Sequence, residues 1–213
     1  MDELSKEYVV SFFDTKLMLH GDRPEAVGLS SKGQILRHQS MLDVGEIDNS
    51  KILDFGCGKG DFYKYLKYND VNVKYSGFDI NEKLIGLAEK KYPGIDFRVF
   101  DIDRDVLDED FDYIFLCGVF NLRIEGIDET IKGTLIKLFQ HCRTALAFNA
   151  LSSDEPKKDF ELHYTDPEDI SDFAARNLSP YVSIIQDRIP HDFTMFVYRD
   201  IYRFRDLKKR VRP

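Results

Sequence analysis

A chain of 213 residues is long enough to bury the full hydrophobic core of one domain. Its hydrophobic share of 43% and its mixed charges exclude a disordered or fibrous chain, and no repeat or low-complexity linker divides it. The net charge of -8 argues against a general nucleic-acid-binding protein, which needs cations to replace phosphate counterions. We therefore expect a single domain over residues 1–213 that is not a general nucleic-acid-binding protein.

The cysteines also restrict the class of protein. Cys57, Cys117 and Cys142 are far apart and odd in number, which matches neither a zinc site nor a disulfide framework. We expect no metal site and a reducing, cytoplasmic location. The N-terminus lacks a basic start followed by an apolar run, and no apolar run is long enough to cross a bilayer. Neither a signal peptide nor a membrane partner is expected.

The first 46 residues are predicted to form an N-terminal helical cap of two helices. Apolar residues recur at helical spacing from Leu4 to Leu19, and Gly21 offers a stop. After a loop with a proline and a glycine, Ser30 or Ser31 is placed to cap the second helix. That helix carries the apolar residues Ile35, Leu36, Met41 and Leu42.

From Lys51 onward, strand and helix patterns alternate. Strands are predicted at 51–55, 73–80, 95–99, 113–119 and 145–149. Helices are predicted at 61–68, from a cap at Asn81 to Pro93-Gly94, along the stripe Ile131, Leu135, Leu138 and Cys142, and at 167–177 after a cap at Asp166. The last two β-rich runs, 182–188 and 193–198, are predicted to form a hairpin.

This alternation predicts an α/β fold with a doubly wound, mostly parallel sheet between two layers of helices. The core spans 51–198, and the terminal antiparallel hairpin departs from a plain dinucleotide-binding arrangement. The tail, 199–213, is rich in Arg and Lys. A solvated terminus is the first reading of the tail, and contact with an acidic partner is the alternative.

The most informative segment is the glycine-rich turn that follows the first strand of the core. Gly56, Gly58 and Gly60 alternate along it, so that a ligand can approach the backbone closely, and Asp54 and Asp61 flank it. The nicotinamide fingerprint has a different glycine spacing, and its pyrophosphate avoids flanking negative charge. Two acids suit a ligand with positive charge and an amino group, and S-adenosylmethionine is such a ligand.

Two further acids follow the next two strands. Asp79 ends the second strand of the core, where it can accept hydrogen bonds from both ribose hydroxyls. Asp101 ends the third, where it can accept from an adenine amino group. Ile80 and Ile102 follow these acids and are expected to sandwich the adenine ring.

Together these motifs, with Phe-Asp-Tyr-Ile-Phe-Leu at 111–116, resemble the class I S-adenosylmethionine-dependent methyltransferases over 51–198. The resemblance implies a three-layer fold with seven strands and a reversed C-terminal hairpin. It also implies S-adenosylmethionine as cofactor and S-adenosylhomocysteine as product. On this resemblance Asp54, Gly56, Cys57, Gly58 and Gly60 hold the methionine moiety. By the same resemblance, Gly118 lines the region of the sulfonium.

The sequence also offers candidate residues for contact with the acceptor and with the methionine carboxylate, and each has an alternative interpretation. Arg37 is placed to pair with the carboxylate, and a surface cation is the alternative. Asn121 and Arg123 either contact a polar substrate or cap a helix. The long polar segment 149–166 is predicted to contact substrate or act as a lid, and His163 and Tyr164 in it are candidates for a catalytic base.

The sequence therefore favours a methyltransferase that acts on a small-molecule acceptor. A protein or RNA methyltransferase is one alternative, and a non-catalytic S-adenosylmethionine-binding protein is another. The acceptor, the methylated atom and the oligomeric state are left open by the sequence.

Overall fold

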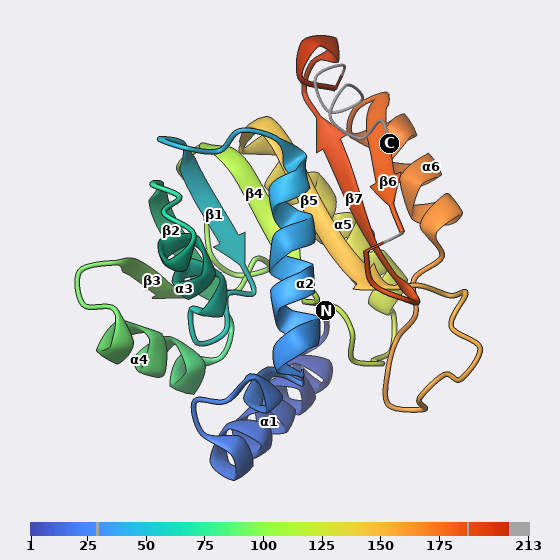
Figure 1. Cartoon of the computed structure of the whole chain (residues 1–213). Helices are drawn as coiled ribbons and strands as arrows, with labels where there is room; N and C mark the ends of the chain where they lie inside the picture. The colour runs from blue at the N-terminus through green and yellow to red at the C-terminus, as the bar shows by residue number, and fades with distance from the viewer. Residues whose placement is uncertain (29, 187, 205–213) are drawn as a thin grey trace.

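A computed structural model describes residues 1–28, 30–186 and 188–204 of the chain. Seven strands form one sheet in the order β3-β2-β1-β4-β5-β7-β6 (Figure 1). The strands are β1 Lys51–Phe55, β2 Lys74–Asp79, β3 Asp96–Val99, β4 Phe111–Cys117, β5 Cys142–Leu151, β6 Tyr181–Ile185 and β7 Asp192–Tyr198. Strands β1 to β5 are parallel, whereas β7 runs antiparallel to both β5 and β6. The predicted parallel sheet with a reversed hairpin is confirmed.

Six α-helices and two short 3-10 helices that lie wholly within the described residues accompany the sheet, and residues 201–204 are also helical. They are α1 Glu3–His20, η1 Pro24–Val27, α2 Ser31–Met41, η2 Leu42–Val44, α3 Asp61–Tyr68, α4 Glu82–Lys91, α5 Ile127–Gln140 and α6 Pro167–Asn177. Side-chain caps begin several of them, because a free N–H in the first turn needs an acceptor. Ser30 accepts from the N–H of Gly33, Asn81 from that of Leu84, and Asp166 from those of Glu168 and Asp169. The predicted caps are therefore confirmed.

Hydrophobic side chains form one buried cluster on each face of the sheet. On one face, Leu135 of α5 and Ala174 of α6 pack with strand residues such as Phe148. On the other face, Leu66 of α3 and Ala88 of α4 pack with strand residues such as Ala147. The alternation along β5 sends adjacent side chains to opposite faces, as expected for a strand that is covered on both sides. The predicted three-layer fold is confirmed.

The helix α1 packs differently from the others. It lies beyond the ends of the central strands rather than on a face of the sheet (Figure 1), and Ser5 and Lys6 are its buried residues. Its apolar residues Leu4, Tyr8, Met18 and Leu19 are 77%, 42%, 78% and 63% exposed. The helical spacing of apolar residues predicted the helix but not its place outside the core.

Several boundaries differ from the sequence predictions. Cys142 was placed on a helical stripe, which is wrong: it is the first residue of β5 and pairs with Phe111. The fourth strand begins and ends two residues earlier than predicted, so Gly118 and Val119 lie in the loop that follows it. Val99 is 50% exposed because β3 is an edge strand. Of the basic tail, 205–213 lies outside the described residues.

Within the described ranges, no helix is both long and apolar enough to cross a membrane.

Candidate functional site

A cavity of about 430 Å³ opens at the carboxyl ends of the parallel strands. Its walls come from α1, α2, the glycine turn after β1, the loops after β2, β3 and β4, and the start of α5. Every cofactor residue predicted from sequence lines it except Gly60. The lining members are Arg37, Asp54, Gly56, Cys57, Gly58, Asp79, Ile80, Asp101, Ile102 and Gly118. In open parallel sheets, this edge is where ligands bind.

The glycine turn is held against the end of β2. The N–H groups of Gly56 and Cys57 both donate to the carbonyl of Phe78, at 2.7 and 3.1 Å. Gly56 has φ of 75°, and a Cβ there would lie 2.6 Å from the side chain of Val119. A larger residue would therefore be strained and would clash. Gly60 instead begins α3 and packs near Phe97 and Tyr92, which explains why it does not reach the cavity.

Asp54 is buried near the end of β1 and is one of the residues that line the cavity. Burial raises the pKa of this carboxyl to about 7, although a hydrogen bond from the Tyr75 hydroxyl at 2.5 Å opposes the shift. A cationic group bound beside Asp54 would favour the charged carboxylate. The carboxyl is thus suited to an ammonium ligand.

Asp79 fixes the turn as well as lining the cavity. Its two oxygens accept from the N–H groups of Gly58 and Asn81, each at 2.8 Å. Burial raises the pKa of Asp79, and these two N–H bonds act in the opposite direction. Each carboxylate oxygen keeps a second lone pair, so both can still accept a hydroxyl from a ligand.

Asp101 lines the cavity together with Ile80 and Ile102. One of its oxygens accepts from the Lys6 ammonium at 2.7 Å, and the other accepts from the N–H of Asp103 at 3.0 Å. Sequence reasoning missed Lys6, because no local signal connects a residue of the first helix to the loop after β3. The contact ties α1 to the cavity wall.

The negative charge of Asp61 is paired with a cation of the protein itself. Its carboxylate contacts Lys59, which is only 1% exposed, and it accepts from the Gln34 side chain at 2.8 Å. From the sequence, Asp61 was expected to act with Asp54 as a pair of acids that suits a cationic ligand. Because Lys59 pairs with Asp61, the negative charge of Asp61 is offset within the protein.

Arg37 reaches the cavity from α2 and is buried. Its Nε donates to Asp192 Oδ2 at 2.7 Å, and Asp192 is a residue that the sequence analysis did not single out. A Cβ on Gly118 would lie 3.0 Å from Asn121 Nδ2 and 3.7 Å from Arg37 Nη1. Gly118 therefore brings the backbone close to two polar side chains in the cavity.

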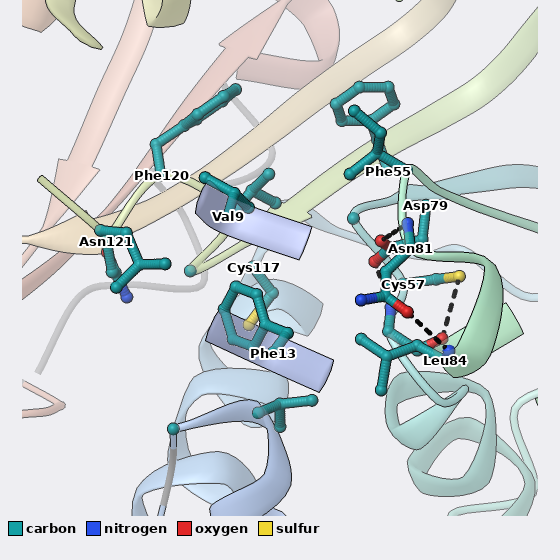
Figure 2. A pocket seen from close by; sticks show the side chains of 18 of the residues that line it. Val9, Phe13, Phe55, Cys57, Asp79, Asn81, Leu84, Cys117, Phe120 and Asn121 are labelled. Atoms are coloured by element: carbon teal, nitrogen blue, oxygen red, sulfur yellow. Dashed lines mark hydrogen bonds between the residues drawn. The ribbon is translucent and has the colours of Figure 1, made fainter. Parts of the chain in front are cut away.

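The opposite wall of the cavity is mainly apolar. Figure 2 shows Val9 and Phe13 of α1 near Phe120 and Asn121 of the loop after β4, across from Asp79. Asn121 Oδ1 is buried and has no hydrogen-bond partner among the described residues. This wall is therefore mainly apolar, with the amide of Asn121 among its polar groups.

The long loop after β5 contributes to the cavity, but not through its predicted bases. Asp159, Glu161 and Leu162 are lining residues, whereas His163 and Tyr164 are not. The N–H of His163 donates to the Asn121 carbonyl at 2.9 Å, and its ring lies 3.3 Å from Asp128. Arg123 also lies outside the lining and stacks over Phe160.

The cysteine thiols in the cavity wall are poor nucleophiles. Burial raises the pKa of Cys117 to about 12 and that of Cys57 well above its ordinary value. In the described part of the chain, no three His, Cys, Asp or Glu side chains gather as a metal site would require.

Known proteins resemble this chain in sequence and in fold. A family model described as a methyltransferase domain matches residues 52–144. A protein of Mycobacterium tuberculosis strain H37Rv, provisionally named as a methyltransferase (Rv1506c), is 30% identical over 163 residues, which cover 74% of this chain and 98% of that protein.

Two solved structures show the same fold at low sequence identity. The magnesium protoporphyrin IX methyltransferase of Synechocystis, with bound S-adenosylmethionine, has a TM-score of 0.62 and 17% identity over 94% of this chain and 98% of that one. The 1,6-didemethyltoxoflavin-N1-methyltransferase of Burkholderia thailandensis has a TM-score of 0.62 and 14% identity over 93% of this chain and 88% of that one. With the matching family model and the mycobacterial relative, they give one conclusion: this chain belongs to the class I S-adenosylmethionine-dependent methyltransferases.

Proposed function

We propose that this enzyme transfers a methyl group from S-adenosylmethionine to a small molecule held in the cavity of about 430 Å³. The observation that carries the proposal is the convergence of three strand ends on one cavity. The glycine turn follows β1, Asp79 ends β2, and Asp101 follows β3, and all three line the same space.

The residues present fit the cofactor. Asp54 would pair with the ammonium of the methionine moiety, and Arg37 Nη1, which is buried without a partner in the described structure, would donate to its carboxylate. Asp79 would accept from the ribose hydroxyls through its free lone pairs. Ile80 and Ile102 would flank the adenine ring, with Asp101 near the amino group.

The bound cofactor would supply a methyl group on a sulfonium, which is an activated leaving group. The protein then has to align the acceptor with that methyl group and exclude water. Val9 and Phe13 of α1 line the cavity over the strand ends and suit the second task. No step in this proposal requires His163 or Tyr164, because a base is optional for a displacement at an activated methyl group.

The walls support a small acceptor rather than a polymer. Side chains from α1, the loop after β4 and the loop after β5 surround the space, and Phe13, Phe120 and Leu162 make much of it apolar. Asn121 Oδ1 would accept a hydrogen bond from an N–H or O–H of the acceptor. By their names, the two enzymes of similar fold described above methylate small molecules, which agrees with this proposal.

Binding of the cofactor is the first test. We would titrate the protein with S-adenosylmethionine and S-adenosylhomocysteine by calorimetry, beside Asp79→Ala and the control Asp172→Ala, an exposed residue of α6. We expect micromolar binding, about -8 kcal/mol, that Asp79→Ala weakens at least about tenfold and the control leaves unchanged. Absence of binding by the unaltered protein would contradict the proposal.

The acceptor class is tested by turnover. Formation of S-adenosylhomocysteine would be measured with a library of small aromatic and aliphatic amines, alcohols and acids, and separately with protein and RNA extracts. We expect turnover only with members of the small-molecule library. Turnover confined to protein or RNA would favour the polymer alternative, and cofactor binding without turnover on any of them would favour a non-catalytic role.

A further inference from the structure

A buried ion pair links the second helix to the last strand of the sheet. Arg37 of α2 donates through Nε to Asp192 Oδ2 of β7 at 2.7 Å, and their side chains are 9% and 2% exposed. A charged pair so far from water is costly unless its remaining groups are also satisfied. The contacts of each partner therefore indicate what the pair does.

Both oxygens of the Asp192 carboxylate have hydrogen-bond partners. Its second oxygen, Oδ1, accepts from Asn149 Nδ2 at 2.6 Å, and the same amide lies 2.9 Å from the carbonyl of Phe193. Next to this contact, the hydroxyls of Thr194 and Ser40 lie 2.7 Å apart. Asp192 is thus fixed by β5 and β7 on one side and meets α2 on the other.

The guanidinium of Arg37, by contrast, is hydrogen-bonded to Asp192 through Nε, whereas its Nη1 has no such contact in the part of the chain that the structure describes. Nη1 is buried without a hydrogen-bond partner among the described residues, and it lies close to Gly118, which lines the cavity as Arg37 does. A buried donor without an acceptor costs free energy, which a ligand can recover by supplying one. The side of Arg37 away from Asp192 is therefore prepared for an anionic or carbonyl oxygen.

The reversed direction of β7 makes this arrangement possible. Because β7 is antiparallel to β5, its first residue, Asp192, pairs with Leu151, the last residue of β5. This brings Asp192 to the sheet edge where the parallel strands end and the cavity opens. A parallel last strand would begin at the opposite edge, away from the cavity.

We infer that Asp192 is a positioning residue: through Nε it orients Arg37 so that Nη1 meets the carboxylate of the methionine moiety. The inference rests on the proposed function, since it needs the cofactor in the cavity. Asp192 contacts Arg37 and not the ligand. Its loss should therefore affect only ligands that carry the carboxylate.

The test compares two ligands that differ in the amino-acid moiety. S-adenosylhomocysteine carries it, whereas 5′-methylthioadenosine keeps the adenine, ribose and sulfur but lacks it. Calorimetry would give the affinity of each ligand for the unaltered protein, Asp192→Asn and Ser40→Ala. Ser40→Ala is the matched control, because it removes the neighbouring contact of α2 to β7 and leaves Asp192 in place.

We expect Asp192→Asn to weaken the affinity for S-adenosylhomocysteine about tenfold or more and to leave the affinity for 5′-methylthioadenosine within about twofold of its original value. Ser40→Ala should change neither affinity. A purely structural role for the pair would lower both affinities together, and that result would overturn the inference. An unchanged affinity for S-adenosylhomocysteine would overturn it as well.

A double substitution keeps the inference testable if a single variant folds poorly. Arg37→Met with Asp192→Asn removes both charges, so no buried ion is left unpaired. In the Arg37→Met background, Asp192→Asn should have no further effect on S-adenosylhomocysteine. Binding of neither ligand by the unaltered protein would be a failure of the proposed function. If the unaltered protein bound both ligands with equal affinity, the proposed cofactor site would remain supported and this inference alone would be overturned.

Discussion

Asp54 and His38 both line the cavity, and burial shifts their pKa values in opposite directions. For Asp54 burial disfavours the anion, with a smaller opposing effect from the Tyr75 hydroxyl, and the pKa rises to about 7. For His38 burial disfavours the cation, and the pKa falls to about 4. The ring of His38 packs on Phe62 and Tyr65, and the charges of Asp61, Arg37 and Lys59 act on it. Each shift makes folding stability depend on pH.

Asp54→Asn should stabilise the free protein at high pH. With a folded pKa of about 7 against an ordinary 3.8, native Asp54 keeps a proton that the unfolded chain releases, so stability falls as pH rises through this window. The variant lacks this loss, so its free energy of unfolding should exceed that of the unaltered protein by on the order of 1–3 kcal/mol at pH about 8 and by little at pH about 4. Urea unfolding at both pH values measures it.

The same variant should bind S-adenosylmethionine at least about tenfold more weakly, because it cannot pair with the ammonium. An Asp54→Asn protein that is no more stable than the unaltered one at pH about 8 would show that Asp54 is not strained by burial in the free state.

His38→Phe should reduce the loss of folding stability that occurs as the pH falls. Its folded pKa of about 4 lies below the ordinary 6.5, so the stability that neutral His38 contributes is present above pH 6.5 and is lost as pH falls toward 4. The variant cannot take up this proton. Thermal unfolding between pH about 7.5 and about 4.5 should show a smaller loss than in the unaltered protein, by up to about 3 kcal/mol. An equal loss in both proteins would contradict the assignment.

At the scale of elements, α1 is held to the rest of the protein by charge more than by apolar burial. Near its start, Lys6 binds Asp101 at 2.7 Å and Glu3 binds Arg104. Farther along, Asp14 accepts from Asn81 at 2.9 Å. The Glu3–Arg104 pair is exposed to water, so it is weak and is screened by salt, whereas the Lys6–Asp101 pair is largely buried. The buried residues of α1, Ser5 and Lys6, are polar. We therefore expect α1 to open more readily than the helices on the sheet faces.

Lys6→Met tests this view of α1. It leaves Asp101 without its ammonium partner and should speed hydrogen exchange in 3–20, while exchange in β5 stays slow. Affinity for S-adenosylhomocysteine should fall a few fold, since α1 walls the cavity. Arg176→Met, which removes an exposed ion pair on α6, is the control. Unchanged exchange in α1 would mean that its packing, and not this pair, holds the helix.

The elements differ in how well the sequence predicts them, and the reason is the range of the forces that set their ends. The boundaries of α3 and α6 were predicted to the residue, because the glycine turn and the cap at Asp166 are local signals. The end of β4 and the start of β5 are set by their pairing across the sheet, which leaves no local mark.

The same difference between local and distant interactions explains which residues of the cavity could be predicted from the sequence. The glycine turn, Asp79 and Asp101 were found because each follows a recognisable strand. Lys6, Lys59 and Asp192 were missed as functional candidates, because their importance comes from partners that are distant in the sequence or from burial that only the fold creates.

For the whole molecule, both hydrophobic clusters are built on the same strands. Phe115 of β4 belongs to one cluster, and its neighbour Leu116 belongs to the other. Loss of either cluster would expose one face of every central strand. We therefore propose that residues 1–213 form a single domain that unfolds as a unit, with the helical cap 1–46 dependent on the core 51–198.

Matched substitutions on the two faces test this cooperativity. Leu135→Ala on α5 and Leu66→Ala on α3 each truncate a side chain that is 0% exposed, so each should lower the free energy of unfolding by about 2–5 kcal/mol. If the domain is single, both variants keep one transition, with equal calorimetric and van't Hoff enthalpies, and only its midpoint falls. S-adenosylhomocysteine at about 100 times its Kd should raise the midpoint of each, since binding adds about 2.7 kcal/mol to the folded state. Leu4→Ala, at a residue that is 77% exposed, is the control and should change stability by less than about 0.5 kcal/mol. Two separate transitions, each sensitive to only one of the two substitutions, would mean that the faces fold independently and that the single-domain proposal is wrong.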